Sequence, residues 1–222
     1  MQISNVSCLP NSIPGIPDPR LPLRESDSAS GSALEPQQQV RSSLSPIESF
    51  YTYQKEPWLA DPGYEDVASL EEYIDRKKSM DHIELALVQI TYHRFQNHLE
   101  STYPDLAKKG FGFTLGPDAN LKIINYSNTL TEAERSTVTE LLNGFEDLKE
   151  RIQAHAKNVM ILAQHDHETF GPTRDIGLHN FHEIVDYHKV LTNGVDGMQG
   201  EWVQQVSSYA SRTDSTYIAT EV

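Results

Sequence analysis

The chain has 222 residues, and its 18 Lys and Arg against 32 Asp and Glu give a net charge of −14 at neutral pH. Residues 61–222 carry −12 of that charge, a balance that repels phosphate backbones and anionic lipids. We therefore expect neither nucleic acid nor a membrane as a partner. No apolar run reaches the ~18 residues that a membrane-spanning helix needs. The single cysteine, Cys8, has no partner for an intrachain disulfide.

The composition changes abruptly at Phe50. All 19 aromatic residues lie at or after this position, whereas the first 49 positions hold eleven serines and seven of the twelve prolines. A segment without aromatic residues buries too little apolar surface to offset an ordering entropy of roughly 1–2 kcal/mol per residue. We therefore predict a disordered N-terminal leader over residues 1–44, a folded domain over residues 45–212 and a flexible tail over residues 213–222.

The folded domain is expected to begin with an aromatic arm. A capping box at Ser45 predicts a short helix in which Phe50 and Tyr51 share one face, and Trp58 follows in a segment rich in Pro and Gly. These aromatic side chains either dock on the protein's own core or anchor a partner, because exposed aromatic patches are rare without a purpose. Phe50, Tyr51 and Trp58 are the candidate partner-binding residues.

The longest predicted helix opens at a second capping box, at Ser69, and runs to about Tyr103 with a possible restart at Asp81. Apolar residues at helical spacing predict one wide stripe along it that faces the core. The residues of that predicted stripe are Ile83, Leu87, Val88, Ile90, Thr91, Phe95 and Leu99.

The remaining elements complete a mostly helical domain. Two short apolar runs separated by a Gly-Pro-Asp turn predict a β-hairpin near 111–125. Further helices are expected from the capping box at Thr131 to Asn143, over 148–162, from Leu178 to Thr192, and over 202–209. The predicted fold class is α+β and predominantly α: a compact helical domain with one small β-hairpin behind a disordered leader.

Histidine is concentrated in one segment, where five of the nine histidines fall within 24 residues. His179, His182 and Asp186 share one edge of the predicted helix, and a turn carrying His165 and His167 would close over it. Imidazoles with a carboxylate suit zinc or iron, and an open coordination position would activate water in a metal-dependent hydrolase. The alternative is a solvated acidic and histidine-rich surface, because the apolar face of the same helix lies elsewhere. No sequence pattern assigns a catalytic residue.

The leader has features of an export signal. Met1-Gln2-Ile3-Ser4 places an aliphatic residue at position three, the first acidic residue is Asp18, and serine is frequent throughout. In these respects the leader resembles that of type III secreted proteins from plant-associated Gram-negative bacteria. The resemblance implies secretion by a route independent of a signal peptide, as an effector in virulence, with a host protein or a secretion chaperone as the partner.

The body is also similar to uncharacterised bacterial helical proteins. The similarity lies in the hairpin followed by Leu130-Thr131-Glu132-Ala133-Glu134 and the Leu141-Leu142-Asn143 helix stop. It implies a bacterial source and transfers no functional residue. The expected function is that of a secreted effector-like protein that binds a protein partner without catalysis. The alternatives are the metal-dependent hydrolase and a cytoplasmic accessory or regulatory protein.

Overall fold

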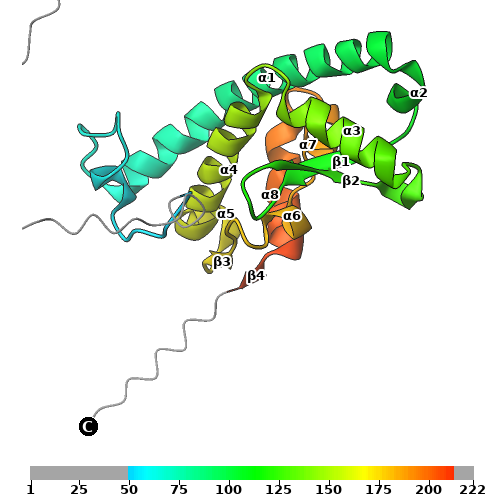
Figure 1. Cartoon of the computed structure of the whole chain (residues 1–222). Coiled ribbons are helices and arrows are strands. Elements are labelled where there is room, and N and C mark those ends of the chain that lie inside the picture. The colour runs from blue at the N-terminus through cyan, green and yellow to red at the C-terminus, as the bar shows by residue number, and fades with distance from the viewer. Residues whose placement is uncertain (1–49, 213–222) are drawn as a thin grey trace, which may run out of the picture. The chain divides into compact units, whose positions relative to one another are not determined.

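The computed structural model describes residues 50–212, which form a helical domain with two short antiparallel strand pairs (Figure 1). The predicted leader over 1–44, the tail over 213–222 and the start of the aromatic arm at 45–49 lie outside the described residues. Residues 50–54 have no regular secondary structure in place of the helix predicted from Ser45.

The predicted fold class, α+β and predominantly α, is confirmed. The α-helices are α1 (Leu70–Thr102), α2 (Pro104–Ala107), α3 (Glu132–Asn143), α4 (Leu148–His165), α5 (His167–Phe170), α6 (Phe181–Ile184), α7 (Tyr187–Thr192) and α8 (Met198–Tyr209). Two 3-10 helices are η1 (Pro57–Leu59) and η2 (Tyr126–Asn128). The predicted hairpin is β1 (Gly112–Leu115) paired with β2 (Leu121–Ile124), and a second pair, β3 (Arg174–Asp175) with β4 (Ser211–Arg212), was not predicted.

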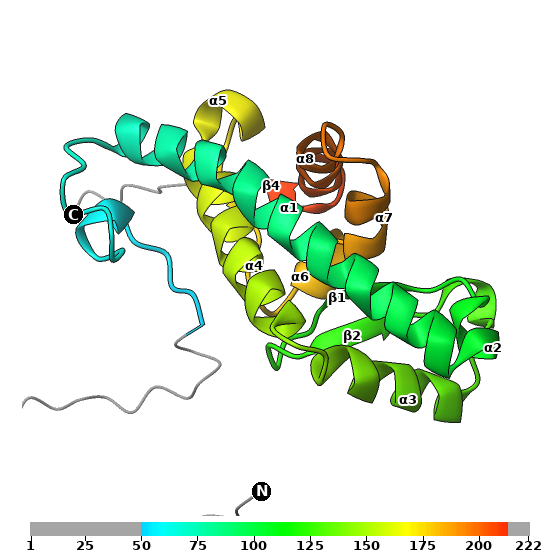
Figure 2. The ribbon, with the colours of Figure 1, turned by 90° about the horizontal axis from the view of Figure 1, so that it is seen from above.

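Helix α1 is the longest element of the described domain, and α4, α7 and α8 all contact it. It begins where predicted, because the Ser69 hydroxyl accepts the Glu72 backbone N–H at 3.2 Å and caps the first turn. It then runs unbroken for 33 residues, with no restart at Asp81. Helices α4, α7 and α8 pack against the same buried face of α1, with α4 along one flank of that face and α7 and α8 along the other (Figures 1 and 2). Seen from above, α1 lies in front of these helices, with α4 visible on one side of it and α7 and α8 on the other (Figure 2).

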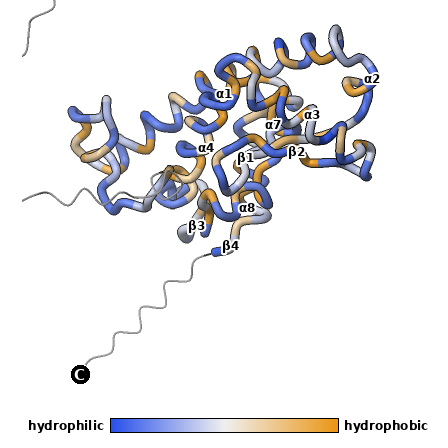
Figure 3. The backbone as a smooth tube through the Cα atoms, in the orientation of Figure 1, coloured by the Kyte–Doolittle hydropathy of each residue, from blue (hydrophilic) through white to orange (hydrophobic). Residues whose placement is uncertain are grey.

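Helix α1 carries two apolar faces, and only one of them is buried. The inner seam consists of Leu85, Val88, Tyr92, Phe95 and Leu99, which follow one another at alternating steps of three and four residues and are all buried. Ile83, Leu87 and Ile90, predicted to face the core, are instead 54, 42 and 51% exposed. The prediction of a single inward stripe was wrong for these three residues. Hydrophobic residues accordingly recur along the whole length of α1 in Figure 3.

The hairpin is held onto the helices by α3. The predicted capping box at Thr131 is present, with the Thr131 hydroxyl bonded to Glu134 N–H and the Glu134 carboxylate bonded back to Thr131 N–H. At the other end of α3, the Asn143 amide accepts from Leu121 N–H and donates to Leu121 C=O, both at 2.8 Å. The Asn143 side chain, at the predicted end of α3, thus attaches this helix to the edge of β2 through two hydrogen bonds.

The single helix predicted from Leu178 to Thr192 is broken into α6 and α7. The break lies at Val185, which has extended backbone angles, and at Asp186. The Asp186 carboxylate accepts the backbone N–H groups of His188 and Lys189 and so starts α7 as its N-cap. The prediction of a continuous helix was wrong because the Asp186 side chain bonds to backbone N–H groups that a continuous helix would bond to backbone carbonyls. It thereby ends one helix and starts the next.

A buried carboxylate joins three helices at the centre of the domain. Asp81 of α1 is fully buried, and its Oδ2 accepts the indole N–H of Trp202 of α8 at 3.0 Å. Its Oδ1 accepts from Asn158 of α4 at 3.1 Å and lies 3.1 Å from Nε2 of His155, also on α4. The Tyr187 hydroxyl lies 2.9 Å from the other ring nitrogen of His155. Every one of these groups is buried, so each depends on the others for its polar contacts.

This Asp81 network sets the charge of the carboxylate. Burial alone would raise the pKa of Asp81, but the contacts from His155, Trp202 and Asn158 together hold that pKa below its usual range. Asp81 is therefore ionised in the folded protein at neutral pH. Its charge is tolerated in the core only while α4 and α8 stay in their places beside α1.

We predict that Asp81→Ala lowers the free energy of unfolding by about 3–5 kcal/mol, the usual cost of breaking a buried charged contact by removing one partner. Urea unfolding of the purified chain measures the change. The matched control is Asp75→Ala, on the exposed side of the same helix, which is expected to change stability by less than about 0.5 kcal/mol. Equal effects from the two substitutions would contradict the structural role of Asp81.

Candidate functional site

The predicted metal-binding segment contributes to a polar hollow of about 300 Å³. The hollow is lined by side chains from η2, from the α6–α7 junction and from α8. The polar residues around it include Tyr126, His182, Asp186, Lys189, Glu201 and Gln205. His182 and Asp186 of the predicted histidine cluster come together here with other ionisable groups.

Asp186 lines this hollow, and both of its carboxylate oxygens already accept hydrogen bonds. Besides capping α7, it accepts a hydrogen bond from the Tyr126 hydroxyl. Burial, followed by this bond, raises the pKa of Tyr126 well above its ordinary value. The approach requires a glycine at position 112, because a Cβ there would collide with the Tyr126 hydroxyl and lie 2.7 Å from Asp186 Oδ1. Asp186 is buried, so the prediction that it faces away from the core was wrong.

The structure separates most of the predicted metal ligands. His182 lies in the hollow near Asp186, with Nδ1 buried and without a hydrogen-bond partner among residues 50–212. His179 is exposed, 4.0 Å from Asp175. His167 is exposed and bonds to the Gly171 carbonyl at 3.0 Å.

His165 belongs to a different environment. It is buried at the end of α4, where the Tyr53 ring stacks on it with a centroid separation of 5.0 Å. Burial, with a smaller contribution from His167, lowers the pKa of His165 and favours the neutral ring. Within residues 50–212, no three His, Cys, Asp or Glu side chains are grouped to hold a metal ion. The zinc or iron site formed by His165, His167, His179, His182 and Asp186 stays a prediction without geometric support from the described part of the chain.

The three candidate partner-binding aromatics pack against the domain itself. Phe50 is buried beneath the Lys157 ammonium group, which lies 4.9 Å from the ring centroid. The Tyr51 hydroxyl donates to Gln164 Oε1 at 2.8 Å. Trp58 is half-buried, and its ring lies 6.5 Å from that of Tyr73. Of the two roles open to this arm, the structure shows docking on the protein's own core, and partner binding by these residues stays a prediction.

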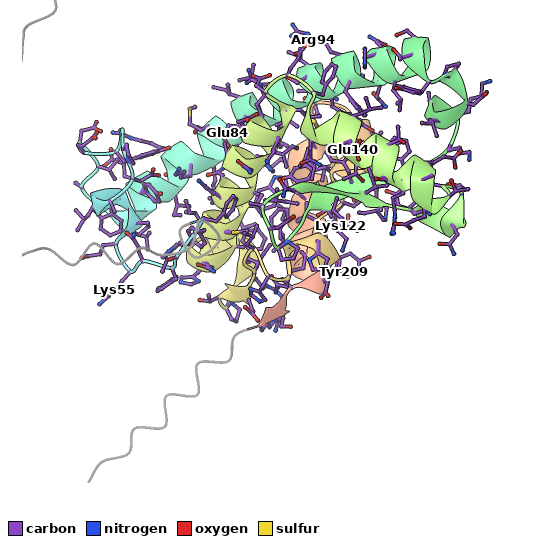
Figure 4. The ribbon with its side chains drawn as sticks, viewed as in Figure 1. Lys55, Glu84, Arg94, Lys122, Glu140 and Tyr209 are labelled. Atoms are coloured by element: carbon purple, nitrogen blue, oxygen red, sulfur yellow. The ribbon has the colours of Figure 1, made fainter. Side chains whose placement is uncertain are left out.

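A second candidate for a binding site is the exposed face of α1. Met80, Ile83, Leu87 and Ile90, which we call the outer seam, follow one another at steps of three, four and three residues, and each is exposed. Such steps are those of a coiled-coil seam, where a partner helix packs knobs into holes. No Lys or Arg occurs between Lys78 and Arg94, so the outer seam is flanked by little positive charge. Arg94 lies on α1 one turn after Ile90, the last residue of the outer seam, and projects outward from the helix (Figure 4).

Glu84 lies on α1 beside the outer seam and close to the Asp81 network. Its Oε2 is buried without a hydrogen-bond partner among the described residues. Burial raises the pKa of Glu84, with His155 and Lys77 opposing the rise and Asp81 adding to it. The charged carboxylate is therefore destabilising in this position, on the boundary between the two seams.

The outer seam was missed at the level of sequence because its residues were merged with those of the inner seam. The sequence did hold the signal: two apolar series with three-four spacing run along α1, offset from each other, where a helix facing one core needs a single series. Two such series on one helix predict two packing surfaces. The described chain supplies a neighbour for only one of them.

Comparison with known protein families, with curated proteins and with solved structures gives no match. Within residues 50–212, no helix combines the length and the apolar character needed to cross a membrane.

We predict that Glu84→Gln raises the free energy of unfolding at pH 7 by about 1 kcal/mol, because it removes a charge whose buried oxygen is unsatisfied. Since the folded-state pKa is raised, the natural chain gains stability as the pH falls through that value. The difference between the two chains should disappear below about pH 4, where glutamate is protonated in the unfolded chain as well. Urea unfolding at both pH values measures this.

The matched control is Glu140→Gln on the exposed side of α3 (Figure 4). It is expected to change the free energy of unfolding by less than about 0.5 kcal/mol at either pH. A Glu84→Gln chain that is less stable than the natural chain at pH 7 would contradict the account of this carboxylate.

Proposed function

We propose that this protein acts by binding a helix of a partner protein along the outer seam of α1, without catalysis. The observation that carries the proposal is the exposure of Met80, Ile83, Leu87 and Ile90 on a helix whose inner seam is already buried. Contiguous exposed apolar side chains in a soluble domain mark interaction sites. Their spacing fits the helix-in-groove mode of recognition, in which a helix is read through anchors three and four residues apart.

The other candidate offers less to a ligand or a substrate. In the polar hollow, Asp186 is occupied by Tyr126 and by the start of α7, and Glu201 bonds to Asn193 and Gln205. These groups are arranged to hold α7 and α8 together. Within residues 50–212, by contrast, the outer seam is not held in such contacts, and for that reason we place the function there.

The second part of the proposal concerns where the protein acts, and it rests on the sequence of the leader. We propose that residues 1–44 direct secretion by a type III route and that the domain then binds a host protein, or a secretion chaperone before export. The support is the sequence composition of the leader alone: its many serines, its lack of aromatic residues and the late first acidic residue, Asp18.

The outer seam is tested by the double substitution Ile83→Gln with Leu87→Gln, which keeps good helix formers and adds no charge. Because both side chains are exposed, the melting temperature should fall by no more than a few degrees. Partner binding should be lost. The measurement is affinity capture with the full chain, followed by binding of each identified candidate to purified natural and substituted chains.

The matched control is Val195→Gln, an exposed aliphatic residue outside α1, which should leave partner binding unchanged. The proposal fails if a purified partner binds the substituted seam as tightly as the natural one. A large loss of thermal stability on substitution would also contradict it, because that would show the outer seam to be part of the core.

The export proposal predicts that a chain lacking residues 1–45 is no longer secreted by a type III-competent bacterium, because it lacks the segment that the secretion channel engages. Its far-ultraviolet circular dichroism should match that of the full chain over the helical bands, since the described helices begin after residue 50. Secretion of the shortened chain at the level of the full chain would refute the proposal.

A further inference from the structure

The second strand pair brings two arginines face to face. Strands β3 and β4 lie together at one edge of the domain (Figure 1), and their register places Arg174 directly opposite Arg212. Residues directly opposite each other in an antiparallel pair project from the same face of the sheet, with their Cβ atoms about 5 Å apart. Like charges in that arrangement repel each other and weaken the strand pair. A group that offsets the two positive charges is therefore expected on this face.

Arg174 is buried without a carboxylate beside it. The residue is 7% exposed, and its Nε is buried without a hydrogen-bond partner among residues 50–212. Within the same residues no Asp or Glu forms an ion pair with Arg174, and the carboxylate of the neighbouring Asp175 instead lies 4.0 Å from His179 Nε2. Buried arginines are almost always paired, because removing a charge from water is costly unless an opposite charge offsets it.

Other partly buried cations of the domain follow this rule. The Lys77 side chain is 14% exposed, and its ammonium group contacts the Asp61 carboxylate at 2.7 Å. The Lys78 side chain is 28% exposed and contacts Asp166 at 3.0 Å. Arg174 is buried and departs from the pattern, so its charge has to be offset in another way.

The contact that Arg174 does make leaves most of its donors unused. Among the described residues its side chain forms one hydrogen bond, from Nη1 to the Ala210 carbonyl at 3.3 Å. Ala210 is the C-cap of α8, so this bond lies at the negative end of the helix dipole. A guanidinium has five N–H donors in a planar fork that fits two oxygens of a carboxylate or phosphate at once. One long bond to a carbonyl accounts for the position of Arg174 and leaves its fork open.

A hollow of about 560 Å³ lies against this arginine. Its volume is in the range of sites for small molecules. The Tyr53 ring, which is 56% exposed, offers a flat surface at the hollow, and the half-buried Thr173 offers a hydroxyl. The lining residues are Tyr53, Gln164, His167, Pro172, Thr173, Arg174 and Asp175.

We propose that Arg174, with Arg212 on the same face of the strand pair, binds the carboxylate or phosphate group of a small organic anion in this hollow. The anionic group meets the open fork of Arg174 and offsets the repulsion between the two guanidinium groups. Tyr53 and Thr173 contact the rest of the ligand. The site uses no residue of α1, so it goes beyond the proposed function and stands or falls independently of it.

The charge of the whole chain restricts how such a ligand binds. The net charge of −14 works against the approach of any anion, so long-range attraction does not supply the affinity. The affinity has to come from direct contacts with the two arginines. A carboxylate or phosphate, which presents two oxygens to one fork, is therefore preferred over chloride, which presents a single acceptor atom.

The experiment is a nuclear magnetic resonance titration of the full chain, labelled with nitrogen-15 and observed through the Nε–H signals of its arginines. The probes are inorganic phosphate in one arm and benzoate in the other, each up to about 50 mM, with the ionic strength held constant by sodium chloride. The Arg174 signal should follow a saturable curve with a Kd of about 10 mM or below for at least one probe. The probe that binds more tightly distinguishes a phosphate ligand from a carboxylate ligand.

Two substitutions test the two arginines. Arg174→Lys keeps the positive charge and removes the fork, so it should weaken binding at least tenfold, as followed on the backbone signal of Thr173. Arg212→Gln changes an exposed residue and should weaken binding about threefold to tenfold, as followed on the Arg174 signal. The matched control is Arg135→Gln, an exposed arginine paired with Glu132 on α3, which should leave the affinity unchanged.

Melting temperatures of all the chains separate a loss of binding from a loss of folding. If Arg174→Lys does not fold, Arg212→Gln carries the test, because its side chain is exposed. The proposal is overturned if the Arg174 signal stays in place or drifts linearly like that of Arg135, which would show an adventitious ion only. Equal affinities of the natural and Arg212→Gln chains would also overturn it.

A last comparison tests whether the chain supplies its own anion. Residues 213–222 contain two acidic residues, Asp214 and Glu221. In the full chain with Asp214→Asn and Glu221→Gln, the probes should bind with the natural affinity. Binding that appears in this substituted chain and not in the natural one would overturn the proposal, because it would assign the arginines to carboxylates of the chain itself.

Discussion

The ionised carboxylate of Asp81, buried between three helices, decides which face of α1 becomes core. Its two oxygens are in contact with Trp202 on α8 and with Asn158 and His155 on α4. Turning α1 about its axis to bury the outer seam would carry the carboxylate away from these groups. An unpaired buried charge costs several kcal/mol, more than the gain from exchanging one row of aliphatic residues for another of similar size.

The surface available for function follows from this constraint. Once Asp81 has fixed the rotation of α1, Leu85, Val88 and the aromatic residues of the inner seam fill the core, and the outer seam is left facing outward. The same helix thus performs two tasks: it organises α4, α7 and α8 around one side and presents a row of apolar side chains on the other (Figure 2). Glu84 lies between the inner seam and the outer seam, where the burial of its charged carboxylate lowers the stability of the fold.

Local signals in the sequence were enough to predict the helices α1, α3, α4 and α8 and the β1–β2 hairpin. The caps at Ser69 and Thr131 and the strands of the hairpin depend on near neighbours, and they appear where predicted. The orientation of α1 did not follow from its periodicity, since two seams compete and the choice depends on contacts between positions 81, 155 and 202. Asp186 was misread for a related reason, because its role as a cap and its bond to Tyr126 come from the fold around it.

The most direct test of two seams on one helix is the accessibility of isoleucine methyl groups in the natural chain. With labelled isoleucine and a soluble paramagnetic agent, the account predicts strong broadening of the nuclear magnetic resonance signals of Ile83 and Ile90. The signals of Ile152, which is buried on α4, should remain sharp. If Ile83 and Ile90 are protected to the same degree as Ile152 in dilute monomeric protein, the outer seam is part of the core and the account is contradicted.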